Sequence, residues 1–346
     1  MEDESYFAVR NDWLEQAVGR TELLGGISAT ERAGVLRVAL GVAEQATAEL
    51  NRYPAVAEVE AQTVRIPAVA IACVAMIPDL GRRAQVDLTL LELGLYVFDD
   101  ILDRVLGGYR IAELTSFAAD CLRAAAGMPT GRTLTGDITD ETVVMIGDSS
   151  AALRSHPPAA WHYDYYLQQL THGVDAGVQE LAWQADHAKW PDYSQYLANG
   201  GWSCFGPATV AVLLNLLGPT APLAEHTGQL QRVAWLVGRC IRLYNDLRSA
   251  EREKLDGTPN AVLILCRGSG LSQVEAAARI LIEADRYLAE LVGLLDTVPT
   301  TLREVVGSTV RLVQFARDWY LARELHGFTV DELVELTDEL PGESAA

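Results

Sequence analysis

The sequence of 346 residues lacks the marks of several common protein classes. Its five cysteines are widely spaced and form no Cys-x-x-Cys pair, which argues against a disulfide framework or a zinc site and indicates reduced core residues. No segment has 18 uninterrupted apolar residues, and the N-terminus MEDESYF lacks the basic and apolar regions of a signal peptide. We therefore expect a cytoplasmic protein with no membrane span.

Positive charge is also scarce. There are 27 Lys and Arg against 47 Asp and Glu, and the resulting net charge of -20 disfavours binding to nucleic acid or to an anionic membrane. The six histidines are scattered, and no Ser-His-Asp or Cys-His arrangement suggests nucleophilic catalysis. An anionic substrate would need local help from a divalent metal or a few arginines.

The hydrophobic pattern is helical. Apolar residues make up 49% of the chain and recur at three- and four-residue spacing, while alternation with period two is nearly absent, so we predict an all-α protein. The expected helices lie at about 28–52, 57–77, 83–107, 111–126, 139–153, 159–187, 192–217, 222–254, 271–296 and 300–325. We expect one helical domain at 28–326, with an N-terminal segment at 1–27 and an acidic C-terminal tail at 327–346.

The stretch FDDILD places three carboxylates directly after the apolar run LGLYVF. On a helix, Asp103 repels Asp99 and Asp100 by about 0.2–0.5 kcal/mol per pair. Gly107 and Gly108 should stop the helix soon afterwards, so the acids lie near its negative end, where anions are unfavourable. The pattern predicts a positive partner, although an acidic surface turn is the simpler alternative.

A second row of side-chain oxygens lies in CIRLYNDLRSAEREK. Asn245, Ser249 and Glu253 have the spacing i, i+4, i+8, which places them on one helical face. Mg²⁺ takes oxygen ligands and typically binds through one or two carboxylates plus substrate phosphates. Alone, this row could be the solvated face of an amphipathic helix. Together with FDDILD, in this order and about 145 residues apart, it favours a shared magnesium site.

These two strings resemble the DDxxD and NDxxSxxxE motifs of class I terpene synthases, and the similarity covers about residues 30–325. The resemblance implies a single-domain helical barrel in which the motifs face each other and three Mg²⁺ ions grip a prenyl diphosphate. By this resemblance, Asp99 would bridge two metals and Asp103 would assist. The triad Asn245, Ser249 and Glu253 would hold the third ion. The metal candidates are Asp99, Asp100, Asp103, Asn245, Ser249 and Glu253.

Arginines should complete the grip on the diphosphate, because a guanidinium donates paired hydrogen bonds to phosphate oxygens. Arg317 in ARDWYLAREL is the first candidate, and Arg242 and Lys254 beside the triad are further ones. Tyr320 lies three residues after Arg317, whereas the family often has an adjacent Arg-Tyr pair. Asn199 stands where many bacterial members have a diphosphate-sensing arginine, which is a departure from the family.

The hydrocarbon end of such a substrate needs an apolar, water-free chamber. Aromatic faces can stabilise a carbocation there, at about 0.5–2 kcal/mol per contact. The segment YLANGGWSCFGPATV, with its glycines and proline, is predicted to break a helix beside this chamber. The aromatic candidates, for each of which core packing is the alternative, are Tyr96, Trp202, Phe205, Trp235 and Trp319.

The resulting hypothesis is a class I terpene synthase that ionises a prenyl diphosphate and closes rings by carbocation chemistry. Gly94, Gly201 and Gly238, together with a likeness to actinobacterial diterpene synthases, favour a C20 substrate, either geranylgeranyl diphosphate or a precyclised C20 diphosphate. The alternatives are a sesquiterpene synthase acting on farnesyl diphosphate, a chain-elongating prenyl diphosphate synthase and a non-catalytic helical scaffold. The sequence has no DxDD motif for a class II cyclase, and a homodimer stays open.

Overall fold

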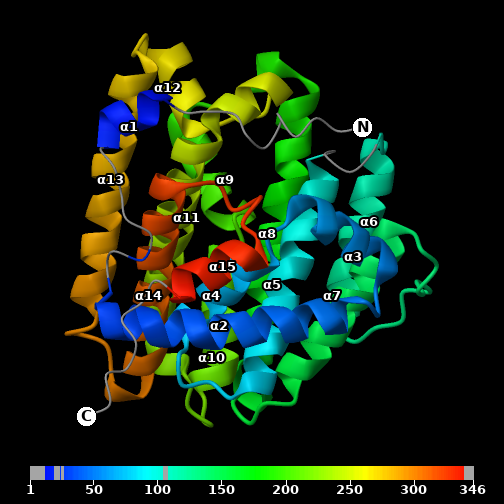
Figure 1. The fold of residues 1–346 in the computed structure, drawn as a ribbon. Helices are drawn as coiled ribbons and strands as arrows, with labels where there is room; N and C mark the ends of the chain where they lie inside the picture. The colour runs from blue at the N-terminus through cyan, green and yellow to red at the C-terminus, as the bar shows by residue number, and fades with distance from the viewer. Residues whose placement is uncertain (1–11, 19–23, 25–26, 104–107, 339–346) are drawn as a thin grey trace.

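The computed structural model describes residues 12–18, 24, 27–103 and 108–338, and in these ranges every regular element is a helix (Figure 1). The α-helices are α1 (Asp12–Val18), α2 (Ala29–Leu50), α3 (Pro54–Thr63), α4 (Ile66–Met76), α5 (Arg82–Leu102), α6 (Ile111–Ala125), α7 (Ile138–Arg154), α8 (Ala159–Ala185), α9 (Tyr193–Ser203), α10 (Gly206–Leu217), α11 (Thr227–Asp256), α12 (Ala261–Ser269), α13 (Gln273–Leu294), α14 (Thr300–Ala322) and α15 (Val330–Asp338). The prediction of an all-α protein is confirmed.

Six of these helices and the short α9 close a ring. Helix α4 contacts α5 and α14, α11 contacts α14, α9 and α10, and α8 contacts α5, α9 and α10. In Figure 1, α2 crosses in front of this ring, α6 and α7 flank it on one side and α13 on the other. The motif helices α5 and α11 therefore lie on different parts of the same ring, as a barrel with one shared interior requires.

The stretch expected as one helix at 57–77 is two helices bent by 91° from each other. Val64 ends α3 in the left-handed region, with φ of 49°, and Pro67 is the second residue of α4. A proline has no backbone N–H, so it fits the first turn of a helix and not its middle. The expectation of a single helix here was wrong because Pro67 marks a helix start.

The helix break predicted within 192–217 is confirmed. Helix α9 ends at Ser203, α10 begins at Gly206, and Phe205 between them has φ of 54°. Gly173 on α8 makes room for the displaced ring, because a Cβ there would lie 2.7 Å from Cε1 of Phe205. The break therefore turns Phe205 inward between α8 and α10.

Both ends of the described chain pack onto the helical body. Helix α1 contacts α13, and α15 contacts α2. Phe328 and Leu333 are fully buried, and the backbone N–H groups of Gly327 and Phe328 donate to the carbonyls of Thr63 and Val64. Much of the stretch expected as a tail is thus ordered by packing, while residues 339–346 lie outside the described residues.

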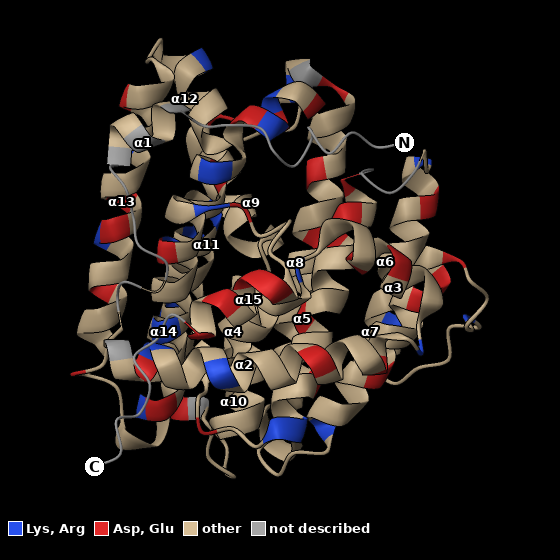
Figure 2. Cartoon of the chain, viewed as in Figure 1, with Lys and Arg blue, Asp and Glu red and all other residues tan. Residues whose placement is uncertain are grey.

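One helical stretch, Tyr193–Leu217, is long and apolar enough to cross a membrane by composition, and 78% of its most apolar window is buried inside the protein. The bent pair Pro54–Thr63 and Ile66–Met76 would pass the same test as one span. A buried core helix meets this criterion as readily as a membrane helix does. Figure 2 shows acidic residues distributed along helices throughout the chain.

Candidate active site

The first motif lies at the C-terminal end of α5. The helix ends at Leu102 with Asp103 as its C-cap, and the expected stop at Gly107 lies outside the described residues. Phe98, Ile101 and Leu102 are buried in the core, which fixes the rotation of the helix and hence the directions of the acids between them.

Asp100 is committed to an internal ion pair. Its Oδ2 lies 2.7 Å from Nη2 of Arg65, which is itself buried and 2.6 Å from Glu60. Adjacent residues on a helix point about 100° apart, so Asp99 and Asp100 face different surroundings. We expected Asp100 among the metal ligands, but in the structure its carboxylate forms an ion pair with Arg65.

Asp99 and Asp103 face a region that is rich in negative charge. Burial raises the pKa of Asp99 well above its usual range, and the charges of Asp103 and Asp100 raise it further. Burial, with the charges of Glu180 and Glu253, raises the pKa of Asp103 to about 7. Carboxylates held this close need additional positive charge to stay ionised together.

The second motif faces inward along α11. Ser249 is fully buried and its Oγ donates to the carbonyl of Asn245 at 3.0 Å. Glu253 is buried as well, and Nδ2 of Asn260 donates to its Oε2 at 2.8 Å. The same amide group lies 3.5 Å from Oγ of Ser249. Asn260, the N-cap of α12, therefore fixes two of the three motif side chains, a role that sequence analysis missed because it missed α12.

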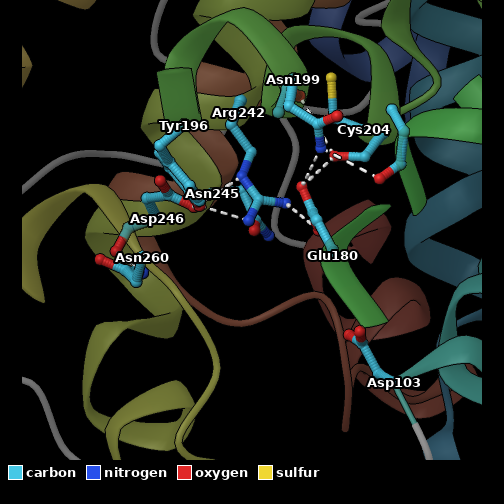
Figure 3. A network of polar contacts seen from close by, with 12 residues as sticks. Asp103, Glu180, Tyr196, Asn199, Cys204, Arg242, Asn245, Asp246 and Asn260 are labelled. Atoms are coloured by element: carbon cyan, nitrogen blue, oxygen red, sulfur yellow. Dashed lines mark hydrogen bonds and ion pairs between the residues drawn. The ribbon is translucent and has the colours of Figure 1, made fainter. Parts of the chain in front are cut away.

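Arg242 is the cation that reaches into this acidic region, as Figure 3 shows. Its Nε lies 3.1 Å from Oδ1 of Asp246 and donates to the hydroxyl of Tyr196 at 2.6 Å. Its Nη1 lies 3.7 Å from Oε2 of Glu180. Gly200 on α9 allows this path, because a Cβ there would lie 3.0 Å from Cγ of Arg242.

Glu180 on α8 collects donors from three directions (Figure 3). Besides Arg242, it accepts hydrogen bonds from Oγ of Ser203 at 2.7 Å and from Nδ2 of Asn199 at 3.2 Å. Asn199 therefore touches the acid that Arg242 also contacts. Asn199 stands where many family members have a sensing arginine. Its amide and the guanidinium of Arg242 on α11 both contact the carboxylate of Glu180. No motif in the α8 sequence singled out Glu180.

One residue of each motif lines the same cavity, whereas Asp103, Ser249 and Glu253 line neither this cavity nor the one that adjoins it. The wall of the first cavity includes Asp99 and Asn245, one from each motif, together with Arg242 and Glu92. The cavity encloses about 530 Å³ of space outside protein atoms, the part open to solvent included.

A second, more apolar cavity adjoins the first and shares part of its wall. The residues common to both walls are Glu92, Tyr96, Ile241 and Tyr320. The Tyr320 hydroxyl lies close enough to Tyr96 and Asn245 for both to influence its pKa. We therefore describe the two cavities as the outer and the inner lobe of one chamber, with these shared side chains between them. Phe315, which sequence analysis missed, lines the inner lobe.

The aromatic candidates divide into two groups. Tyr96 and Phe205 line the first cavity and Trp319 the second. Trp202 lies against His172, with ring centroids 4.8 Å apart. Trp235 lies 3.8 Å from the guanidinium carbon of Arg239 and packs edge-on against Tyr287. Neither Trp202 nor Trp235 lines the two cavities, so packing accounts for both.

Two of the expected diphosphate contacts have other partners. Arg317 forms a paired ion bridge with Asp285 on α13, at 2.8 and 3.2 Å, and lines neither cavity. Lys254 is more than half exposed and lies 3.7 Å from Glu251. Tyr320 and Arg242, by contrast, both line the first cavity.

The three glycines that suggested a larger pocket serve helix packing instead. A Cβ at Gly238 would lie 1.8 Å from the carbonyl oxygen of Gly201, so this pair lets α11 approach α9. A Cβ at Gly94 would meet Ile146 on α7 at 3.4 Å. None of the three lines either cavity, so the size argument drawn from them does not hold.

The donor set fits a hard cation that is completed by a substrate. Among the described residues, no group of three or more His, Cys, Asp or Glu side chains forms a ready-made metal cage. What the region offers are carboxylate, amide and hydroxyl oxygens, with an excess of buried negative charge. Magnesium characteristically binds through few protein ligands and takes the rest from phosphate and water.

Residues 94–290 match the family described as terpene synthase family 2, C-terminal metal binding. Over 162 residues the chain is 32% identical to an ent-cassa-12,15-diene synthase of Oryza sativa subsp. indica, which covers 44% of this chain and 18% of the relative. Over 213 residues it is 28% identical to an ent-kaurene synthase of Vitex agnus-castus, covering 56% of this chain and 24% of the relative. The chain thus spans less than a quarter of these curated relatives.

Solved structures share the fold. An isoprene synthase from grey poplar superposes with a TM-score of 0.67 at 16% identity, covering 88% of this chain and 56% of that one. A linalool/nerolidol synthase from Streptomyces clavuligerus, in complex with 2-fluorogeranyl diphosphate, gives 0.66 at 17% identity, covering 82% and 98%. The family match spans more than half of the sequence, and one residue of each motif lines the same cavity. This chain belongs to the class I terpene synthases.

Proposed function

We propose that this protein ionises a prenyl diphosphate with the help of magnesium and cyclises the resulting carbocation to a terpene hydrocarbon or alcohol. The observation that carries the proposal is the shared cavity, whose wall joins Asp99 of the first motif to Asn245 of the second. A polar, acidic rim beside an aromatic interior suits a substrate with an anionic head and a hydrocarbon tail.

The residues proposed to hold magnesium are Asp99, Asp103, Asn245, Ser249 and Glu253. Three observations support this set: all donors are oxygens, the pKa values of both aspartates are raised, and Asn260 orients Glu253. Three ions are proposed, as the solved isoprene synthase complex contains three Mg²⁺ ions with dimethylallyl-S-thiolodiphosphate. When bound, magnesium stabilises the negative charge that develops on the leaving diphosphate.

Arg242 is proposed as the guanidinium that binds the diphosphate, since it lines the cavity between the two motifs. Its contacts with Glu180 and Asp246 hold it in place before substrate arrives. The chamber behind excludes water, which would otherwise trap the carbocation. Tyr96, Phe205 and the other wall aromatics offer ring faces to the positive charge.

A C20 substrate, geranylgeranyl diphosphate or a precyclised C20 diphosphate, is favoured. The curated relatives carry the names of ent-cassadiene and ent-kaurene synthases, which supports a diterpene product. Farnesyl diphosphate is the alternative, and the germacradien-4-ol synthase from Streptomyces citricolor shares the fold over 96% of its length. A single catalytic domain at 28–326 and a cytoplasmic location complete the proposal.

The test is to incubate the protein with geranyl, farnesyl and geranylgeranyl diphosphate in parallel, with Mg²⁺ and with EDTA. Diphosphate release is measured together with gas chromatography of the extracts. The proposal expects release and a cyclic terpene from at least one substrate, with Mg²⁺ only. Absence of release from all three, or release that EDTA leaves unchanged, would contradict it. Products of longer chain length after addition of isopentenyl diphosphate would indicate elongation instead.

A further inference from the structure

One carboxylate lies where the outer lobe of the chamber meets the more apolar inner lobe. Glu92 is on α5, seven residues before Asp99, which corresponds to roughly 10 Å along the helix. It lines both lobes of the chamber, among Leu95, Ile241 and the aromatic rings. Glu92 is partly buried, and acidic side chains are seldom withdrawn from water without a cationic partner, so this position calls for a reason.

The contacts of Glu92 orient the carboxylate without neutralising it. Oγ1 of Thr209 on α10 lies 3.1 Å from Oε1 of Glu92 and donates to it. The same hydroxyl lies 3.3 Å from the carbonyl of Phe205, at the helix break. Within the described ranges no Lys or Arg forms an ion pair with Glu92, and its pKa is raised by burial to about 7.

The titratable groups around Glu92 are neutral at physiological pH. Cys73 on α4, Tyr96 on α5 and Tyr166 on α8 each have a pKa raised mainly by burial. Burial raises the pKa of Tyr320 on α14 to about 12. The charged residues of the outer lobe, Asp99 and Arg242, lie towards the motif end. Among the described residues that line the inner lobe, Glu92 is therefore the acid–base group that can change its charge near neutral pH.

We propose that the carboxylate of Glu92 accepts the proton that ends the carbocation reaction. This inference rests on the proposed function. A C–H bond next to the cationic carbon breaks, its electron pair becomes the new C=C bond, and the proton moves to a carboxylate oxygen of Glu92. The alkene leaves neutral, and the carboxylic acid returns its proton to water when the chamber opens. Thr209 is a positioning residue, because it holds one oxygen and leaves the other towards the chamber.

The position of Glu92 separates this role from that of the leaving group. Diphosphate held at the two motifs can take a proton only from carbons near the rim. Glu92 lies roughly 10 Å deeper and serves carbons in the ring system. A carboxyl group whose pKa is near the working pH is also the best compromise between being ionised and being basic.

The test uses the full chain with geranylgeranyl, farnesyl and geranyl diphosphate and Mg²⁺. It compares Glu92→Gln, which keeps the shape, with Glu92→Asp, which keeps the acid. We expect the main alkene, measured per diphosphate released, to fall by at least about tenfold as a share of products in Glu92→Gln. Glu92→Asp should retain part of that alkene. An unchanged alkene share in Glu92→Gln would overturn the inference.

The unmodified protein gives a second measurement that needs no variant. Between about pH 8 and about pH 6 the share of the main alkene should fall several-fold as Glu92 becomes protonated. Leu312→Val, which alters the chamber wall and keeps the acid, should retain this pH dependence, whereas Glu92→Gln should lose it. A product ratio that is flat across this range overturns the role of Glu92 and leaves the proposed function standing. Absence of diphosphate release from all three substrates overturns both.

Discussion

The rim of the chamber, where the two motifs lie, and the interior of the chamber differ in how their acidic side chains are paired. At the rim, Glu180 and Asp246 are met by Arg242 and by hydrogen-bond donors, while burial and neighbouring carboxylates raise the pKa values of Asp99 and Asp103. In the chamber a single acid, Glu92, has one hydroxyl partner. The rim is therefore built to attract further cations, and the chamber to keep one group close to its protonation midpoint.

The largest expected effect is at the rim. Asp99→Asn should lower diphosphate release by at least about 10²–10³-fold, because it removes a charge that balances the proposed magnesium ions. The fold should survive, since the change also relieves repulsion with Asp103 and Asp100. Circular dichroism and a release assay measure both. Asp87→Asn is the matched control: it lies on the same helix, pairs with the exposed Arg83, and should keep full activity.

The next effect separates two arginines. Arg242→Ala should cost about 3–5 kcal/mol of stability, because it leaves the buried Asp246 and Glu180 without their cation. Arg317→Ala should cost about 1 kcal/mol or less, since its partner Asp285 is partly exposed.

Urea titration measures these stabilities. The activities are compared with Arg242→Lys in place of Arg242→Ala, because lysine keeps the positive charge. Diphosphate release should fall by about 10²-fold in Arg242→Lys and stay within about threefold in Arg317→Ala, because a lysine loses the paired guanidinium hydrogen bonds. Equal losses in the two variants would mean that Arg317 moves to the rim when substrate binds.

The chamber acid makes a prediction about stability. The folded pKa of Glu92 is about 7 and its ordinary value 4.5, so the folded state binds more protons between these values and loses stability as the pH rises through that window. Glu92→Gln should therefore raise the free energy of unfolding by about 1–3 kcal/mol at about pH 8.5, and by less at about pH 5.5. Urea titrations at the two pH values measure the difference; a gain that does not depend on pH would disagree.

The smallest effect is expected outside both regions. Lys254→Ala removes an exposed partner of Glu251, and such pairs contribute about 0–1 kcal/mol. Diphosphate release should stay within about twofold of the original rate. A loss of diphosphate release similar to that of Arg242→Lys would mean that the diphosphate site extends to Lys254 at the end of α11.

Local patterns predicted the fold class, most helices and the break before Pro207. The i, i+4, i+8 spacing also placed Asn245, Ser249 and Glu253 on one face, since such periodicity is encoded within a few turns. The predicted helix boundaries were wrong where a residue can either begin a helix or lie in a loop. Pro67 lies in the first turn of α4, and Asn260 caps the short α12. Both residues look like loop signals in the sequence alone.

The rest of the site depends on tertiary contacts. Nothing in the α8 sequence distinguishes Glu180 from a surface acid, and only the approach of Arg242 past Gly200 joins them. Arg317 has the local features of a phosphate ligand, yet Asp285 on the neighbouring α13 takes its guanidinium. Glu92 belongs to no motif, because its importance comes from the cavity that five helices form around it.

The most direct test of the central claim is whether both oxygen rows hold the same ions. Melting temperature is measured with Mg²⁺ and inorganic diphosphate for the unmodified protein, Asp99→Asn, Glu253→Gln and the double variant, with Asp87→Asn as the control. If the rows share one site, the two ligands together raise the melting temperature of the unmodified protein and the control, and each single variant loses most of that rise. The double variant then loses little more. A rise that survives in Glu253→Gln but not in Asp99→Asn would contradict a shared site.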